Sequence, residues 1–144
     1  MLLNTILYNL ILIFPLLTFL SLLLSGTFFG IFGAISLCFI NMFFVVCASV
    51  YLGLFFSFKF GLSELLWVWL EIDKNLIMFS VRFDSLTSVM FILVSLVSFC
   101  VHFYSFVYMF SQPYVVRFLS YLSLFTFFML ILVSAANFLT LFLV

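Results

Sequence analysis

Apolar residues run along this chain in long stretches that short polar segments interrupt. A helix needs about 20 consecutive apolar residues to cross a bilayer, and four stretches are long enough, at about 2–24, 34–57, 85–110 and 117–136. The last residues, 137–144, are apolar but too few to span, and they are predicted as the start of a fifth helix. The pattern therefore predicts an all-α membrane protein, with residues 1–144 forming a single membrane domain.

Small residues separate the first two predicted spans, from Ser25-Gly26 to Gly33-Ala34. The segment contains a GxxxG spacing, which in other contexts marks close helix–helix packing, but its place between two spans favours a turn. Ser111-Gln112-Pro113 is predicted to close the third span, since proline interrupts helices.

The segment from 58 to 84 differs from the rest of the chain, because it holds seven of the eight charged residues and both tryptophans. Tryptophan is enriched where a membrane meets water. Part of the segment alternates in polarity around Asp73-Lys74-Asn75, which predicts a short hairpin at the membrane surface. An amphipathic interfacial helix over 62–70 is the alternative.

The composition agrees with the predicted membrane spans and argues against several classes of function. Hydrophobic residues make up 69% of the 144 residues and charged residues only 6%, whereas soluble domains carry about 25% charged residues. A formal net charge of zero gives no support for a nucleic-acid partner. Membrane lipid is the expected surrounding. The cysteines, Cys38, Cys47 and Cys100, are predicted as small buried hydrophobic residues.

The residue types also limit the chemistry. His102 is the single histidine, so this chain cannot supply both axial ligands of a bis-histidine haem, and it has no Cys/His spacing for zinc or an iron–sulfur cluster. We predict no cofactor, metal or catalytic residue in this chain. The predicted spans contain no Asp, Glu or Lys, which membrane proton carriers normally keep, so the chain alone is not expected to pump protons.

Polar residues of the third span recur at helical spacing. They form a polar stripe of five residues on one helix face: Ser88, Ser95, Ser98, His102 and Ser105. One interpretation is a proton route in a hydrated cavity, with His102, Ser98 and Ser105 as its candidates. The other is close helix packing, with His102 hydrogen-bonded inside the bundle. A sparser set on the fourth span favours packing: Ser120, Ser123, Ser134 and Asn137.

Several motifs between 81 and 144 resemble one known family. They are Val81-Arg82-Phe83-Asp84-Ser85-Leu86-Thr87, Val101-His102-Phe103-Tyr104-Ser105, Tyr108-Met109, Arg117-Phe118, Tyr121-Leu122-Ser123-Leu124-Phe125-Thr126-Phe127-Phe128-Met129 and Asn137-Phe138-Leu139. Their order and spacing resemble the N-terminal part of subunit 5 of respiratory complex I, the NADH–ubiquinone oxidoreductase. This subunit is the distal antiporter-like one in the membrane arm.

The resemblance implies a function that composition and residue spacing alone do not indicate. The chain would support proton translocation and assembly of the membrane arm, as part of an H⁺-translocating NADH:ubiquinone reductase. Its redox centres would lie in other subunits. The family's key acid follows a tryptophan beyond the position of Val144, and its partner lysine lies further on. The chain departs from the family at Ala136, where an acid is usual, and at Val107 and Val144, where glycine is usual.

The resemblance also implies partners and a location. We expect a split subunit, in which a second chain carries the remainder of subunit 5 and other membrane-arm subunits of complex I lie alongside. The expected location is the mitochondrial inner membrane. The 25 phenylalanines, whose codons are T-rich, point to an AT-rich organellar genome, and the N-terminus shows no signal or transit peptide pattern.

Two other functions and one conflict of orientation stay open at this point. The chain could be a purely structural accessory subunit of a respiratory complex, or a small transporter that acts as an oligomer. Counting Lys and Arg, three in 58–84 and one at Arg117, places the long loop on the side of synthesis. The resemblance instead implies that the N-terminus and this loop face the intermembrane space, and we prefer that orientation.

Overall fold

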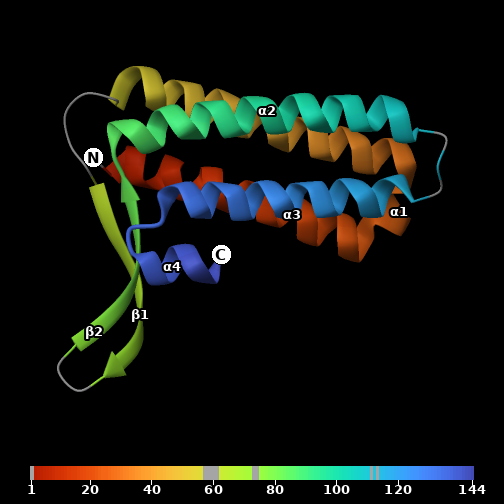
Figure 1. Cartoon of the computed structure of the whole chain (residues 1–144). Helices are drawn as coiled ribbons and strands as arrows, with labels where there is room; N and C mark the ends of the chain where they lie inside the picture. The colour runs from red at the N-terminus through yellow and green to blue at the C-terminus, as the bar shows by residue number, and fades with distance from the viewer. Residues whose placement is uncertain (1, 57–61, 73–74, 111, 113) are drawn as a thin grey trace.

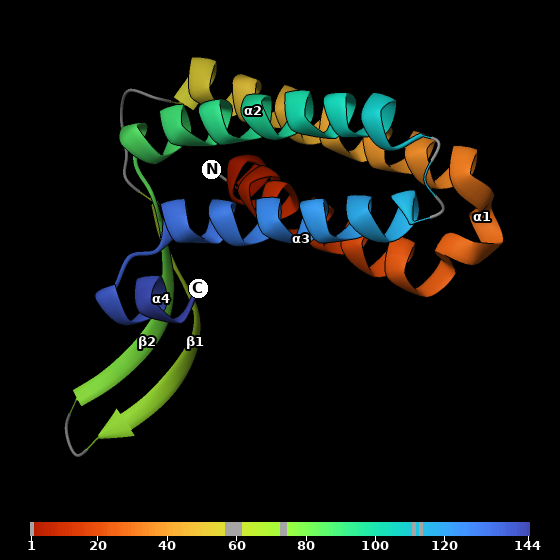
Figure 2. The same ribbon diagram turned by 45° about the vertical axis from the view of Figure 1, so that its right-hand side comes forward.

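The computed structural model describes residues 2–56, 62–72, 75–110, 112 and 114–144. Its elements, in chain order, are α1 (Leu2–Phe56), β1 (Leu62–Ile72), β2 (Asn75–Phe83), α2 (Ser85–Met109), α3 (Val115–Ser134) and α4 (Phe138–Leu143). The two halves of α1, α2 and α3 lie side by side as a layered bundle, and the two strands project from one end of it (Figures 1 and 2).

Four helical segments are long and apolar enough to cross a membrane: Ile6–Leu24, Gly30–Leu54, Ser85–Met109 and Val115–Ser134. They lie within a few residues of the four predicted stretches. The prediction of an all-α membrane protein with four spans is confirmed. After the fourth span, α4 begins at Phe138, where a further helix was expected, and Asn137 N–H donates to Thr140 Oγ1 at its first turn (3.3 Å).

The reversal between the first two spans is sharper than predicted. Helical backbone continues through the small-residue segment, and the break falls at one residue, Gly30, with φ 65° and ψ 175°. Only glycine adopts such a positive φ without steric cost, because it has no Cβ. The expected turn over 25–34 is therefore wrong in extent, and one glycine folds α1 back on itself (Figure 2).

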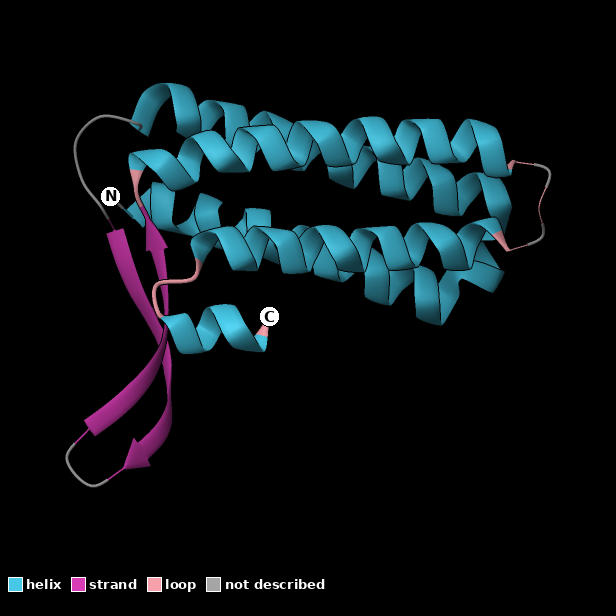
Figure 3. Ribbon diagram, viewed as in Figure 1, coloured by secondary structure: helices cyan, strands magenta, loops and turns pink. Residues whose placement is uncertain are grey.

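The polar segment forms an antiparallel hairpin, as predicted, and the alternative of an amphipathic helix over 62–70 is wrong. Its register pairs Leu62 with Phe83 and Ile72 with Asn75, with irregularities after Leu65 and Val68. Asp73 and Lys74 of the predicted turn lie outside the described residues, as do Ser111 and Pro113 of the predicted third-span terminus. Figure 3 shows the strands leaving the helical layer.

The base of the hairpin is joined to the connection between α3 and α4. Val81 forms an antiparallel bridge with Ala135, and Ala136 N–H donates to the Ser80 carbonyl oxygen at 3.2 Å. Arg82 Nε and Asp84 Oδ2 form an ion pair (2.9 Å) beside this base. The hairpin is thus fixed to the bundle where α2 starts and α3 ends.

Two apolar clusters hold the helices together, because the folded-back α1 packs against both α2 and α3. One cluster lies towards the hairpin end: Tyr8, Ile11, Leu12, Val45, Ala48, Leu52, Val81, Phe83, Phe91 and Leu130. The other lies towards the opposite end: Leu22, Ala34, Ile35, Cys38, Met42, Val115 and Leu119.

The cysteines do not all lie in this core. Cys38 is buried, but Cys47 and Cys100 are exposed on the outer helix faces. The prediction that all three are buried is wrong for these two. An apolar run gives no contrast between inner and outer faces when lipid is the solvent, so the pattern could not separate them.

Candidate functional site

The polar stripe of α2 faces the interior of the bundle along its whole length. All five members are buried, together with Thr87 and Phe91 on the same face. The first turn sets this orientation, because Asp84 N–H donates to Thr87 Oγ1 at 2.7 Å and the helix begins from there. The prediction that the five residues share one face is confirmed.

The hairpin-proximal half of the stripe is closed by hydroxyl pairs from α1. Tyr8 Oη and Ser88 Oγ are 3.1 Å apart, and Ser49 Oγ and Ser95 Oγ are 2.7 Å apart. We call these two pairs the α1–α2 seam. The ring of Tyr8 also stacks on Phe83, with centroids 4.1 Å apart. At Ser88 and Ser95 the packing interpretation is therefore the correct one.

The other half of the stripe is arranged differently. His102 Nδ1 lies 2.8 Å from the Ser98 carbonyl oxygen and 3.4 Å from Ser98 Oγ. The side chain is 1% exposed, yet Nε2 has no hydrogen-bond partner among the described residues. It is the one buried side-chain nitrogen or oxygen in the described part of the chain with this property.

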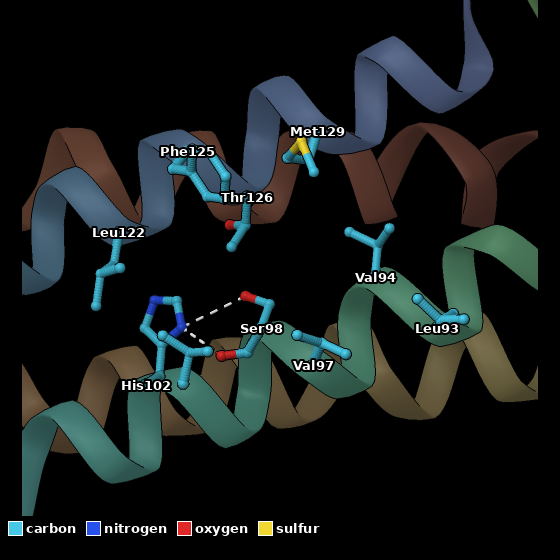
Figure 4. Close-up of a pocket in the computed structure, with 10 residues that line it drawn as sticks. Leu93, Val94, Val97, Ser98, His102, Leu122, Phe125, Thr126 and Met129 are labelled. Atoms are coloured by element: carbon cyan, nitrogen blue, oxygen red, sulfur yellow. Dashed lines mark hydrogen bonds between the residues drawn. The ribbon is translucent and has the colours of Figure 1, made fainter.

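A pocket of about 190 Å³ lies between α2 and α3 beside this histidine (Figure 4). Apart from Ser98, His102 and Thr126, its lining is apolar: Leu93, Val94, Val97, Val101, Leu122, Phe125 and Met129. Figure 4 shows the His102 ring and the Ser98 and Thr126 hydroxyls turned towards the space between the two helices.

The pocket includes two of the three predicted proton-path candidates, His102 and Ser98. Ser105 is buried on the same face of α2 but does not line it. The sequence reasoning missed Thr126, which comes from the opposite wall. The spacing indicates it, because Thr126 follows Ser120 and Ser123 at the same interval of three residues. A pattern of serines alone does not include it.

The buried hydroxyl side chains of α3 form hydrogen bonds with backbone carbonyl oxygens of the same helix. Ser120, Ser123 and Thr126 each donate to the carbonyl oxygen three residues earlier, at 2.6, 2.7 and 2.8 Å. Ser134 does the same with Ile131 at 3.0 Å. Asn137 does not belong to this buried face, because the helix ends at Ser134 and Asn137 is exposed before α4. The packing interpretation holds for the serines and is wrong for Asn137.

The described residues also show which chemistry the site can perform. Nowhere in the described ranges do three His, Cys, Asp or Glu side chains come together as metal ligands do. One imidazole and two hydroxyls border the pocket, whose accessible lining is almost entirely apolar. The residues of the site could therefore exchange hydrogen bonds or a proton, and they carry no metal or redox chemistry of their own.

These observations define a class: a multi-pass helical membrane protein with a buried polar stripe and a hairpin that projects from one end of the bundle. Comparison with known proteins makes the class specific. Residues 69–119 match the family model described as "NADH-Ubiquinone oxidoreductase (complex I), chain 5 N-terminus". The matched segment contains the whole of α2 and all three proton-path candidates. The resemblance inferred from the motifs is confirmed.

Curated relatives agree with the family match. The chain is 52% identical over 73 residues to NADH-ubiquinone oxidoreductase chain 5 of Metridium senile, and 51% identical over 86 residues to that of Acanthamoeba castellanii. It is 57% identical over 74 residues to NADH-quinone oxidoreductase subunit L of Rickettsia bellii. These matches cover 51%, 60% and 51% of this chain.

The matches cover only a small part of each relative, 12%, 11% and 12% of its length. Since 73 residues are 12% of the Metridium relative, that protein has about 610 residues, and the 144-residue chain spans about a quarter of it.

Proposed function

We propose that this chain supplies the N-terminal helices of the antiporter-like subunit 5 of a proton-pumping NADH:ubiquinone oxidoreductase. The observation that carries the proposal is the family match over residues 69–119. It falls on α2, the helix that presents the buried polar stripe. NADH oxidation and quinone reduction would take place in other subunits of the enzyme.

The chain would act by forming one wall of the proton route and by supporting assembly of the membrane arm. Its four spans carry no Asp, Glu or Lys, so the acid and lysine that bind and release the pumped proton must come from elsewhere. We propose that a second polypeptide carries them with the remainder of subunit 5. Residues 1–144 then form a single membrane domain that packs against that partner and other membrane-arm subunits.

Within this wall, the proposed proton-path residues are His102, Ser98 and Ser105. His102 is the one side chain of the four spans that ordinarily titrates near neutral pH. It lies with Ser98 beside the α2–α3 pocket. Ser105 continues the polar face by one turn towards the end of the bundle that lies away from the hairpin.

The proposed location is the mitochondrial inner membrane, with the hairpin on the intermembrane-space side. The start of α1 and the hairpin lie at the same end of the bundle (Figure 1), as this topology requires. Relatives from both mitochondria-bearing organisms and bacteria match the chain, so the fold itself does not restrict the compartment.

A native gel of detergent-solubilised mitochondrial membranes tests the proposal. The gel is stained for NADH dehydrogenase activity, and the active band is analysed by mass spectrometry. We expect peptides of this chain in that band, together with peptides of a second chain that match the remainder of subunit 5. A denaturing gel of the same band then separates the two polypeptides.

Each other outcome overturns a definite part of the proposal. If the denaturing gel shows one long polypeptide that contains both sets of peptides, the split is wrong and the assignment to subunit 5 stands. If the chain migrates with another respiratory complex or as a small oligomer, the assignment itself is wrong. A respiratory complex would then favour the accessory role, and a small oligomer the transporter.

A further inference from the structure

Another cavity lies at the end of the bundle opposite the hairpin, between the reversal of α1 and the start of α3 (Figures 1 and 2). We call it the reversal cleft. Its volume is about 380 Å³, within the range of about 300–1,000 Å³ that small-molecule sites usually have. Leu23, Gly26 and Ile31 of α1 border it on one side, and Tyr114 and Arg117 border it on the other.

Two glycines shape the reversal cleft. Gly26 is buried, and a Cβ at this position would overlap the Val116 side chain, so the glycine lets α1 approach the first turn of α3. Gly30 is exposed, and a Cβ there would meet no other part of the described chain within 4 Å. The cleft is therefore closed at its base beside Gly26 and open at its mouth beside Gly30.

The reversal cleft lies at a boundary of the membrane. The first span ends at Leu24, the second begins at Gly30 and the fourth begins at Val115, so the cleft is bordered by three span ends. Tyr114 is 66% exposed at the same level, where aromatic residues gather between lipid and water. The polar headgroups of a lipid layer lie just outside the hydrocarbon core, and thus at this level.

Arg117 gives the cleft a positive charge that the described chain does not balance. Its side chain is exposed, and no described carboxylate forms an ion pair with it. All four acids of the sequence belong to the segment 58–84, whose described strands project from the opposite end of the bundle (Figure 1). An anion in the cleft therefore meets a guanidinium and no described negative charge.

The lining of the cleft matches the two parts of a phospholipid. A guanidinium binds phosphate through paired N–H groups. Leu23 and Ile31 are 51% and 42% exposed beside it, and acyl chains cover such side chains whereas a soluble anion does not. A lipid with a net negative charge gains more from Arg117 than a zwitterionic lipid, which carries a cation of its own.

We propose that the reversal cleft binds an anionic phospholipid, whose phosphate pairs with the Arg117 guanidinium and whose acyl chains cover Leu23 and Ile31. The lipid joins α1 to α3 where α1 reverses. The site goes beyond the proposed function, because it requires only that the four spans lie in a bilayer. The proposed topology would place it in the leaflet on the matrix side.

Photolabelling of the intact native assembly tests the site. The assembly is placed in phosphatidylcholine vesicles with a trace of phosphatidylglycerol or of phosphatidylcholine that carries a photoreactive group on an acyl chain. Mass spectrometry then locates the labels. We expect phosphatidylglycerol to label the segment from Leu23 to Ile31 about fivefold more than phosphatidylcholine does, the preference that one basic residue near a membrane surface confers. Equal labelling by the two lipids would overturn the proposal.

A set of variants tests the assigned residue. Arg117→Gln should abolish the preference, and Arg117→Lys should keep most of it, because lysine binds phosphate as a point charge. Arg82→Gln is the matched control, since Arg82 is also exposed but lies at the hairpin end. A preference that survives in Arg117→Gln, or that is lost equally in Arg82→Gln, would contradict the assignment.

An electron cryo-microscopy map of the assembly in the same lipid distinguishes the phospholipid from other anions. Headgroup density at Arg117 that continues into acyl chains along α1 supports the proposal. An isolated peak that appears only in buffer with inorganic phosphate would mean a free anion. Density continuous with a carboxylate side chain of another subunit would mean a protein partner. Either of these two results overturns the lipid site.

The failure of this inference is distinguishable from that of the proposed function. Equal labelling in an assembly that stains for NADH dehydrogenase overturns the lipid site alone. A preference for phosphatidylglycerol in a different assembly overturns the assignment to subunit 5 and leaves the lipid site in place.

Discussion

The α1–α2 seam and the α2–α3 pocket both involve the polar stripe of α2, but they differ in whether its side chains have hydrogen-bond partners on the neighbouring helix. In the seam, Ser88 and Ser95 meet hydroxyls of Tyr8 and Ser49 on the neighbouring helix. In the pocket, His102 Nε2 meets no donor among the described residues. One face of α2 therefore carries polar side chains with hydrogen-bond partners on a neighbouring helix and one ring nitrogen without a partner among the described residues.

The difference shows how polar residues are used in a membrane helix. Small hydroxyl side chains permit close approach of two backbones and add a polar contact across the interface, so they help to fix how α1 and α2 pack. An acceptor without a donor contributes nothing to that packing. The described residues leave its hydrogen-bonding capacity unmet, which is why the functional hypothesis rests on His102 and the structural one on the seam.

The largest expected effect comes from removing the side chain at the centre of the seam. Tyr8 is 1% exposed, stacks on Phe83 and contacts Ser88. Tyr8→Ala should cost about 3–5 kcal/mol, as other buried aromatic-to-alanine changes do. The steady-state abundance of the assembled chain on a native-gel immunoblot should fall several-fold or more.

Tyr8→Phe is the matched control for this change. It keeps the ring and removes the hydroxyl, and with it the contact with Ser88, so a loss of about 0.6 kcal/mol is expected. Equal abundance of the Ala and Phe variants would show that the ring contributes no packing energy to the seam.

Overpacking the seam should have the next largest effect. Gly53 is buried between the two hydroxyl pairs, and a Cβ at this position would overlap the side chain of Ile92 on α2. Gly53→Leu should therefore cost about 1–3 kcal/mol. The thermal midpoint for dissociation of the chain from its assembly should drop.

Ser36→Leu is the control for Gly53→Leu, because it adds the same side chain to an exposed position of α1. Its midpoint should stay near that of the unmodified protein. A drop as large as that of Gly53→Leu would mean that the outer face, rather than the seam, limits stability.

The pocket should respond differently from the seam to loss of polarity. His102→Leu removes the buried acceptor together with its need for a donor, so stability should change by less than about 1 kcal/mol. Ser95→Leu, seven residues earlier on the same face, places a larger apolar side chain at the 2.7 Å contact with Ser49 and should be clearly destabilising. Both are compared by the same thermal midpoint.

The two variants should also separate in function. Proton pumping driven by NADH, followed by a pH-sensitive dye in reconstituted vesicles, should fall in His102→Leu while the NADH dehydrogenase stain persists. Full pumping in that variant would remove His102 from the proposed proton path.

The smallest effect expected is the coupling across one hydroxyl pair. Ser49→Ala, Ser95→Ala and the double variant form a double-mutant cycle for the bond of 2.7 Å between the two side chains. Coupling energies of this kind average about 0.6 kcal/mol within membranes. A coupling of zero would mean that the two hydroxyls are adjacent without contributing to stability.

Hydropathy and spacing predicted much of this fold. The four spans, the hairpin around Asn75 and the common face of the polar stripe follow from rules that act within one element. The candidate site was predicted only in part. His102 and Ser98 were identified because they repeat at helical spacing, whereas Thr126 was missed because it lies on another helix, 24 residues further along the chain.

Local sequence thus determined which residues can form each helix, because apolar length and helical period are properties of one segment. It did not determine how the helices are turned against one another, because lipid is as apolar as their outer faces and leaves that choice to packing. Only the tertiary structure decided that Gly30 carries the reversal and that Ser88 and Ser95 find partners on α1. It also decided that the face of α2 with His102 is buried in the bundle, since this depends on the packing of α2 against both of its neighbours.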